Sequence, residues 1–300
     1  MRAGSRTCAA AAINGFRRPP ITEKGNSSLH LSIPEAETET GLCLPSAIRN
    51  ARGALVVAHP GHELRLHGWL ELAQPVVYIF TDGSGHTARS RLETTTRLVL
   101  RAGAKPGSLY GRFTDIEIYT AILNRDLEFF IRLTEELAEA LVREDIQYVV
   151  GDAVEGYNPT HDICRAVIDS AIDLAAKAGK RIANFEFTVV GARDSRDDGD
   201  DAFMIRLHLD QGALDRKMAS ADAYSELRDD IAATVNAIGS TAFQIETFCQ
   251  VTARQTLYAM EAPPFYERYG EKQVKLGHYR ESIRYHEHVL PITNGIRNRV

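Results

Sequence analysis

The sequence predicts an α/β protein built on a doubly wound, mostly parallel sheet that is Rossmann-like and flanked by helices. Three short apolar runs have the length of buried strands and are separated by segments with a helical apolar period; they span residues 54–58, 76–80 and 146–150. Continuous apolar strands that alternate with helices are typical of parallel sheets covered on both faces. We therefore expect the loops after residues 58 and 150 to open at the same edge of the sheet.

The first predicted helix and the segments that follow it keep this alternation. Residues 64–72 place their apolar side chains on one side of a helix, and residues 75–80 form the second buried strand. A helix over residues 90–101 ends at the helix-stopping Gly103. The next stretch, residues 107–115, is rich in glycine and is predicted to be a loop.

The middle of the chain contains the clearest amphipathic helix, over residues 126–143, with phenylalanines and leucines on one side and glutamates on the other. A strand at residues 146–150 follows, and then a long helix that starts near His161 and runs to Gly179. This order repeats the strand and helix alternation of the first part. It extends the predicted parallel sheet by one more unit.

Beyond Gly179 the pattern changes. Residues 182–190 and 203–209 are predicted to be later strands of the same sheet, and residues 210–238 a long helix whose inward anchors are Tyr224 and Leu227. The predicted division is a flexible leader (1–52), an α/β domain (53–250) and a helical and irregular C-terminal extension (251–300). The extension has no assigned role, and we expect it to cover the cleft or to contact a second copy of the chain, as in a homo-oligomer.

Composition narrows the classes of partner. The chain of 300 residues is 44% hydrophobic, which is enough for a substantial core, and carries a net charge of -5. No basic stripe is present, so nucleic acid is not an expected partner. No apolar run has the length of a membrane span. The four cysteines are far apart in the sequence, which is typical of a reducing, cytoplasmic location.

Two loops carry the residues that bear chemistry. His59, His62 and Glu63 directly follow the first apolar run, and His161 comes from the exit of another strand. Two nearby imidazoles and one distant imidazole are a common way to hold zinc with one coordination position open, and neutral imidazole suits zinc better than magnesium or calcium. A water molecule in that position has a lowered pKa and can attack a carbonyl carbon. The sequence therefore indicates a zinc centre.

Four stretches match motifs of one known family. The segment from Ala58 to Glu63 (AHPGHE) resembles the His-Pro-Asp-Asp-Glu signature of the LmbE/PIG-L deacetylases, zinc enzymes that remove acetyl groups from N-acetylglucosamine-type sugars. The segment from Asn158 to Asp162 (NPTHD) resembles their second motif, His-Pro-Asp-His. Thr81-Asp82-Gly83 and the pair Arg91 and Glu93 also have counterparts there. Order and spacing agree from about residue 53 to 170.

The resemblance implies a role for each matching residue. His59, His62 and His161 are implied to be metal ligands, with His62 at the position of the family's aspartate ligand. It also implies that the sugar pocket is lined by three residues: Arg91, Arg112 and Asp115.

Two positions depart from the family's motifs. Gly61 stands where the family has its general-base aspartate, and Asn158 stands where it has a histidine that helps to stabilise the oxyanion. Glycine cannot accept a proton. Either another carboxylate takes the role, with Glu63, Asp152 and Glu155 as the candidates, or deacetylation is impaired. The amide of Asn158 can still donate a hydrogen bond to an oxyanion.

The sequence supports two hypotheses about function. The first is a zinc-dependent amide hydrolase that removes an N-acyl group, in the first place N-acetyl, from an amino sugar or a related small molecule. The second is a noncatalytic member of the same fold that binds a metal or a sugar, with Gly61 and Asn158 as the signs of lost chemistry. Metal content and amine release distinguish the two.

Overall fold

The computed structural model describes residues 48–85, 89–189, 204–225, 227–228, 232, 236, 239, 243–251 and 263–299. Its centre is a seven-stranded sheet with the strand order β3-β2-β1-β4-β5-β7-β6. The strands are β1 (Gly53–Val57), β2 (Val76–Thr81), β3 (Lys105–Phe113), β4 (Tyr148–Asp152), β5 (Ala183–Phe187), β6 (Met204–His208) and β7 (Ile245–Gln250). Strands β1 to β5 pair in parallel, and β7 is antiparallel to both β5 and β6. The predicted fold class is confirmed.

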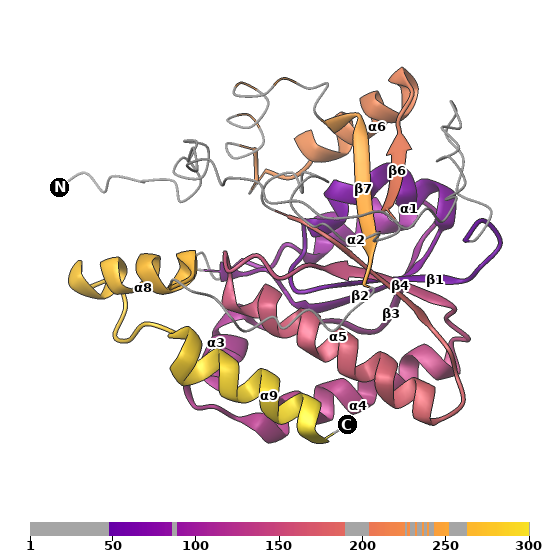
Figure 1. Cartoon of the computed structure of the whole chain (residues 1–300). Coiled ribbons are helices and arrows are strands. Elements are labelled where there is room, and N and C mark those ends of the chain that lie inside the picture. Colours follow the sequence, from indigo (N-terminus) through magenta and orange to yellow (C-terminus); the bar gives the residue numbers. More distant parts are fainter. Residues whose placement is uncertain are drawn as a thin grey trace, which may run out of the picture.

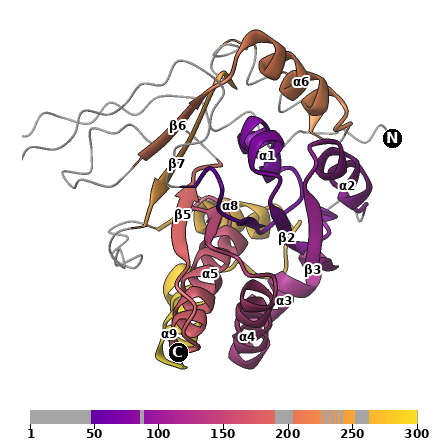
Figure 2. The same ribbon diagram turned by 90° about the vertical axis from the view of Figure 1, so that its right-hand side faces the viewer.

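Helices cover both faces of the sheet (Figures 1 and 2). One face packs against α3 (Asp115–Leu123), α4 (Leu127–Arg143), α5 (Pro159–Lys177) and α9 (Leu290–Arg299). The other packs against α1 (His67–Ala73), α2 (Leu92–Arg101) and α6 (Gln211–Asp222). Alternate residues of β1 are buried on opposite faces of the sheet. Ala54 and Val56 pack against the first helical layer, and Leu55 and Val57 pack against the second. This explains why the first strand is apolar throughout.

The predicted helix over residues 64–72 is divided in two. A 3-10 turn, η1 (His62–Leu66), is followed by α1 (His67–Ala73). The chain enters η1 through Gly61, whose φ of 109° is a conformation that residues with a side chain rarely adopt.

One prediction about local structure was wrong, and a second was right only in part. Residues 107–115 were predicted to be a loop, but most of them belong to β3, an edge strand that tolerates Pro106 and Gly107 because only one of its sides is paired. Its pairing with β2 is irregular, with register shifts between Val77 and Thr81. The helix predicted over residues 210–238 is interrupted: α6 ends at Asp222, a turn follows, and residues 228, 232 and 236 are helical again. The segment after α6 bends back toward the sheet, where Tyr224 is fully buried and Leu227 packs against the core, so both still point inward as predicted.

A buried ion pair holds α6 and β7 against α1. Lys217 donates to Glu246 over 2.8 Å, and both side chains are almost completely buried. The same carboxylate accepts the N–H groups of Gly68 and Trp69 in the first turn of α1. A paired buried charge of this kind is costly to disrupt, so it fixes the position of the chain that continues into Tyr224.

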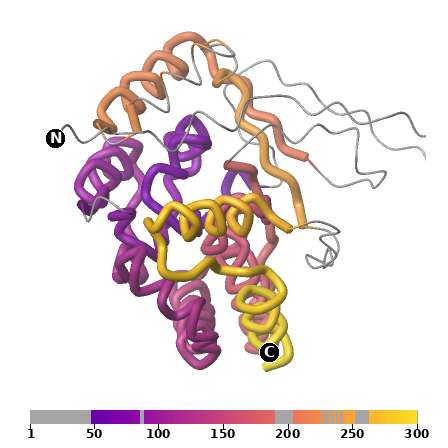
Figure 3. The backbone as a smooth tube through the Cα atoms, turned by 90° about the vertical axis from the view of Figure 1, so that its left-hand side faces the viewer, coloured from indigo at the N-terminus to yellow at the C-terminus, as the bar shows by residue number. Residues whose placement is uncertain are grey.

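The C-terminal residues belong to the helical layer. After α8 (Phe265–Lys275), a π-helical turn, η4 (Tyr285–Val289), leads into α9, which packs on α4 and α5 (Figure 3). Tyr285, Val289, Ile292 and Ile296 are buried in the core of this layer. The expected leader lies outside the described residues up to residue 47. None of the described helices has the length and apolar character that crossing a membrane requires.

Candidate metal centre

Three histidines meet at the carboxyl ends of β1 and β4, as the parallel sheet requires. His59 and His62 lie just beyond β1, and His161 lies in the first turn of α5 after β4. Their ring centres are 5.5 Å apart for His59 and His62, 5.2 Å for His59 and His161, and 4.5 Å for His62 and His161. All three side chains are buried. The fold thus brings together three rings that come from loops distant in the sequence.

His59 is fixed by two partners on other elements. Its Nδ1 lies 2.9 Å from Oδ1 of Asp115 and 2.8 Å from Oγ1 of Thr81. Because a carboxylate only accepts, Nδ1 carries the hydrogen, and Nε2 is left with a free lone pair. Nε2 is buried and has no hydrogen-bond partner among the described residues. Burial lowers the pKa of His59, which favours the neutral ring that a metal requires.

His62 is oriented in the same way by Asp152, at the end of β4. Its Nδ1 donates to Oδ1 of Asp152 over 2.8 Å, and the second carboxylate oxygen accepts the N–H of Ala58. A carboxylate behind a histidine fixes the tautomer and the direction of the ring. Asp152, which the sequence offered as a catalytic residue, is therefore placed as a positioning residue for His62.

His161 completes the cluster without such a partner. Its Nδ1 is buried and has no hydrogen-bond partner among the described residues. Burial, followed by the nearby His62 and His59, holds its pKa well below the usual value. An unpaired nitrogen inside a protein is costly, so its presence needs an explanation. A metal ion is one explanation.

The spacing of the rings fits a shared ion. A zinc-bound nitrogen lies about 2.1 Å from the metal and about 1.1 Å from its ring centre, so two rings at tetrahedral angles have centres about 5 Å apart. The observed distances agree with this value. However, no group of three or more His, Cys, Asp or Glu side chains within the described ranges is already arranged to hold a metal. The ring spacing is the stronger observation, because the ring of His161, whose Nδ1 has no partner among the described residues, can rotate about its broad χ2 and redirect a nitrogen without moving away.

Asp115, implied to bind a sugar, instead holds His59 and accepts the N–H of Gly85 with its other oxygen. Burial alone would raise the pKa of Asp115, but hydrogen bonds from His59, Thr81 and Gly85 outweigh it and keep the pKa well below its usual range. Asp115 is thus an ionised positioning group.

Arg91 lies beside the cluster. Its Nε donates to the carbonyl of Gly83 over 2.7 Å, and its charge contributes to lowering the pKa of both His59 and His161. Three residues were implied to line the sugar pocket. Of these, Arg91 is the one that brings a positive charge to the rim of the histidine cluster.

The remaining carboxylates that the sequence offered are engaged with backbone or neighbouring groups. Glu63 is fully buried and accepts the N–H of Gly61 over 2.7 Å and the O–H of Tyr224. Glu155 accepts the N–H of Val189 over 2.9 Å. Glu63 thus ties the histidine loop to the segment after α6.

Arg112 is placed away from the histidines. Its guanidinium forms a bidentate pair with Glu136 of α4 at 2.6 and 2.7 Å, and both side chains are exposed. We expect Arg112→Ala to leave the KM for an N-acylated substrate within about twofold and to change stability by less than about 1 kcal/mol, as for other exposed ion pairs. Steady-state kinetics and urea unfolding measure the two effects. A tenfold rise in KM would instead show that Arg112 contacts the substrate.

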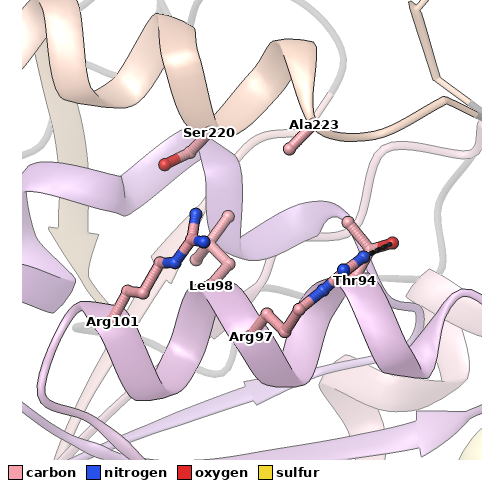
Figure 4. A pocket seen from close by; sticks show the side chains of 6 residues that line it. All are labelled: Thr94, Arg97, Leu98, Arg101, Ser220 and Ala223. Carbon is pink, nitrogen blue, oxygen red and sulfur yellow. Dashed lines mark hydrogen bonds between the residues drawn. The ribbon is translucent and has the colours of Figure 1, made fainter.

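A surface pocket of about 220 Å³ lies elsewhere, between α2 and α6 (Figure 4). It is lined by Thr94, Arg97, Leu98, Arg101, Ser220 and Ala223, none of which the sequence singled out. The three histidines that the sequence singled out lie together in the buried cluster and not in this pocket.

Three residues near the cluster were missed by sequence reasoning as site residues. Thr81 contacts His59, Tyr119 contacts Asn158, and Leu227 lies against Gly61. For Tyr119 a signal existed, since it follows Asp115 by four residues and so lies on the same side of α3. Leu227 had no comparable signal, because its contact depends on how the segment after α6 folds back.

Fold and site together define an α/β protein that carries a buried histidine cluster at the carboxyl edge of a doubly wound sheet. No family model matches the chain, and no curated protein matches it. Among solved structures it is similar to the A40926 pseudoaglycone deacetylase Dbv21, with 16% identity over 67% of this chain and 96% of that chain and a TM-score of 0.45.

Two further structures show a likeness of the same extent. A deacetylase of teicoplanin biosynthesis in complex with teicoplanin is 14% identical, with 67% of this chain and 98% of that chain covered and a TM-score of 0.46. A conserved protein from Thermus thermophilus is 14% identical, with 67% and 94% covered and a TM-score of 0.42. Similarity this low carries no argument about activity, which has to come from the site.

Proposed function

We propose that this chain is a zinc-dependent hydrolase that removes an N-acyl group, in the first place N-acetyl, from an amino sugar or a related small molecule. The observation that carries the proposal is the cluster of His59, His62 and His161, whose ring centres lie 4.5 to 5.5 Å apart. Imidazole is a preferred ligand of zinc, and three protein ligands leave one position open. When bound, zinc would polarise the acyl carbonyl and make a water molecule nucleophilic near neutral pH.

The residues around the cluster orient the histidines, supply charge and transfer protons. Asp115 and Asp152 hold the rings of His59 and His62 in the orientation that presents Nε2. Arg91 supplies a positive charge at the rim, which suits the polar groups of a sugar. Proton transfer is left to Glu63 or Glu155, and Glu63 is the one tied directly to the histidine loop.

The noncatalytic alternative, a member of this fold that binds a metal or a sugar, is favoured by one specific observation. A Cβ atom at Gly61 would lie 2.7 Å from Cδ1 of Leu227, so an alkyl group, not a carboxylate, fills the space next to the loop. Loss of positioned acid-base catalysis typically costs about 10²- to 10⁴-fold in rate. A protein that holds zinc but lacks this help would bind substrate without turning it over at a useful rate.

Metal analysis followed by amine release tests both hypotheses. We expect the full chain to bind about one zinc ion per molecule and to release amine from at least one member of a panel of N-acetylated amino sugars. A chelator should abolish the release, and added zinc should restore it. Bound zinc without any amine release would support the binding protein, and failure to bind zinc would reject the hydrolase and leave only sugar binding.

A further inference from the structure

The amide of Asn158 is largely committed to structural contacts. Asn158 is the N-cap of α5, where its Oδ1 accepts the N–H of Thr160 over 2.8 Å. This contact fixes the orientation of the amide and turns Nδ2 toward α3, where it donates to the phenolic oxygen of Tyr119 over 3.1 Å. Asn158 therefore has at most one N–H left for the oxyanion that it was expected to stabilise. The group that its amide contacts is Tyr119.

The hydroxyl group of Tyr119 is available as a hydrogen-bond donor. Because its oxygen accepts from Asn158, its own O–H points to another acceptor, and the described residues provide none. Tyr119 is half-buried, with its side chain packed against the core of the helical layer. Burial, followed by the negative charge of Asp115, raises the pKa of Tyr119, so the phenol stays neutral and keeps its hydrogen.

Tyr119 also stands between the two segments that supply the histidines. It lies one helical turn after Asp115, which holds His59. Its partner Asn158 lies three residues before His161, at the start of the same helix. The contact with Asn158 therefore brings the phenol to the start of α5, where His161 lies.

We infer that Tyr119 is a further catalytic residue, a neutral donor for the oxygen of the acyl group. This inference rests on the proposed function. As the planar amide becomes tetrahedral, the carbonyl oxygen gains negative charge, and the phenol of Tyr119 donates a hydrogen bond to it. The hydrogen stays on the phenol, so no proton or electron pair is transferred in this contact. Such donors act mainly on the transition state and therefore on kcat.

The first test is Tyr119→Phe in the zinc-loaded protein. We expect kcat to fall about 10²- to 10³-fold while KM stays within about threefold, as for the loss of one oxyanion donor. Zinc content should be unchanged. Tyr78→Phe is the matched control, because its hydroxyl is buried without a hydrogen-bond partner among the described residues and lies in the middle of β2. That control should retain full activity.

A second readout does not depend on turnover. A methylphosphonamidate of the amino sugar carries the tetrahedral, anionic centre of the transition state. We expect Tyr119→Phe to weaken binding of this anion to the zinc-loaded protein by about 10²-fold, while the affinity for the uncharged N-acetyl sugar changes little. If the wild-type chain releases no amine at all, the proposed function fails, and this binding comparison still decides the role of Tyr119.

Asn158→Asp provides an independent variant. An aspartate still caps α5, but it accepts from Tyr119 where asparagine donates, and so turns the phenolic hydrogen away from the substrate. We expect its kcat to fall to a similar extent, and the double variant to be no slower than Tyr119→Phe alone. Two results would overturn the inference: a Tyr119→Phe variant with wild-type kcat and phosphonamidate affinity, or one that loses zinc together with activity.

Discussion

His161→Ala is expected to remove the metal centre. The loss of one of three ring nitrogens should weaken zinc binding by more than about a hundredfold, because even removal of a residue that merely orients a ligand costs about 10- to 100-fold. Amine release should fall by at least the same factor, since the ion contributes several kcal/mol to stabilising the transition state. Isothermal titration with zinc and the amine-release assay measure the two losses.

The fold itself should survive this change. The Nδ1 of His161 is buried without a partner among the described residues, so its removal breaks no hydrogen bond and leaves only a small cavity. His278→Ala is the matched control, because His278 is exposed and lies after α8. It should retain both zinc and activity. If His161→Ala still binds zinc at full affinity, the three rings do not form the proposed site.

The strands that form the centre of the sheet were predictable because of burial. Strands β1, β2 and β4 are covered on both faces, so they appear in the sequence as continuous apolar runs. Strand β3 has partly exposed residues and a proline at an unpaired edge, so its sequence has the composition of a loop. The interruption after Asp222 was missed because the polar sequence on both sides of it has a helical pattern, while burial of Tyr224 turns the chain.

The site was predictable only to the extent that strand ends define it. The positions of His59 and His161 follow from the parallel arrangement of β1 and β4, which brings their carboxyl ends together. The groups that form hydrogen bonds with these rings are set by tertiary contacts, which cannot be predicted from a local sequence pattern. The contact of Asp115 with His59, for example, depends on how α3 follows the irregular edge strand β3.

The glycine at position 61 has a physical explanation in this fold. Gly61 has a φ of 109°, and a Cβ atom there would come within 2.7 Å of Cδ1 of Leu227. Leu227 is held in place by the turn that begins at Tyr224, whose hydroxyl is bonded to Glu63. The loop, the buried carboxylate and the segment after α6 therefore form one packed unit in which a side chain at position 61 has to displace the end of Leu227.

Gly61→Asp should consequently fail to supply a general base and should destabilise the protein. We expect a loss of about 2–4 kcal/mol in the free energy of unfolding, from backbone strain and overpacking together, and no increase in amine release. Gly179→Asp is the matched control, because Gly179 has a φ of 84° and nothing within 4 Å of an added Cβ. The control isolates the backbone strain, expected to be about 1 kcal/mol.

The difference between the two variants in urea unfolding measures the contact with Leu227. Adding Leu227→Ala to Gly61→Asp should relieve the overpacking, so the double variant should lose less than the sum of the two single changes. If Gly61→Asp were as stable as Gly179→Asp and released amine faster than the wild type, the segment after α6 would not occupy this space. A carboxylate at position 61 could then act as the general base, and Glu63 would not be needed for proton transfer.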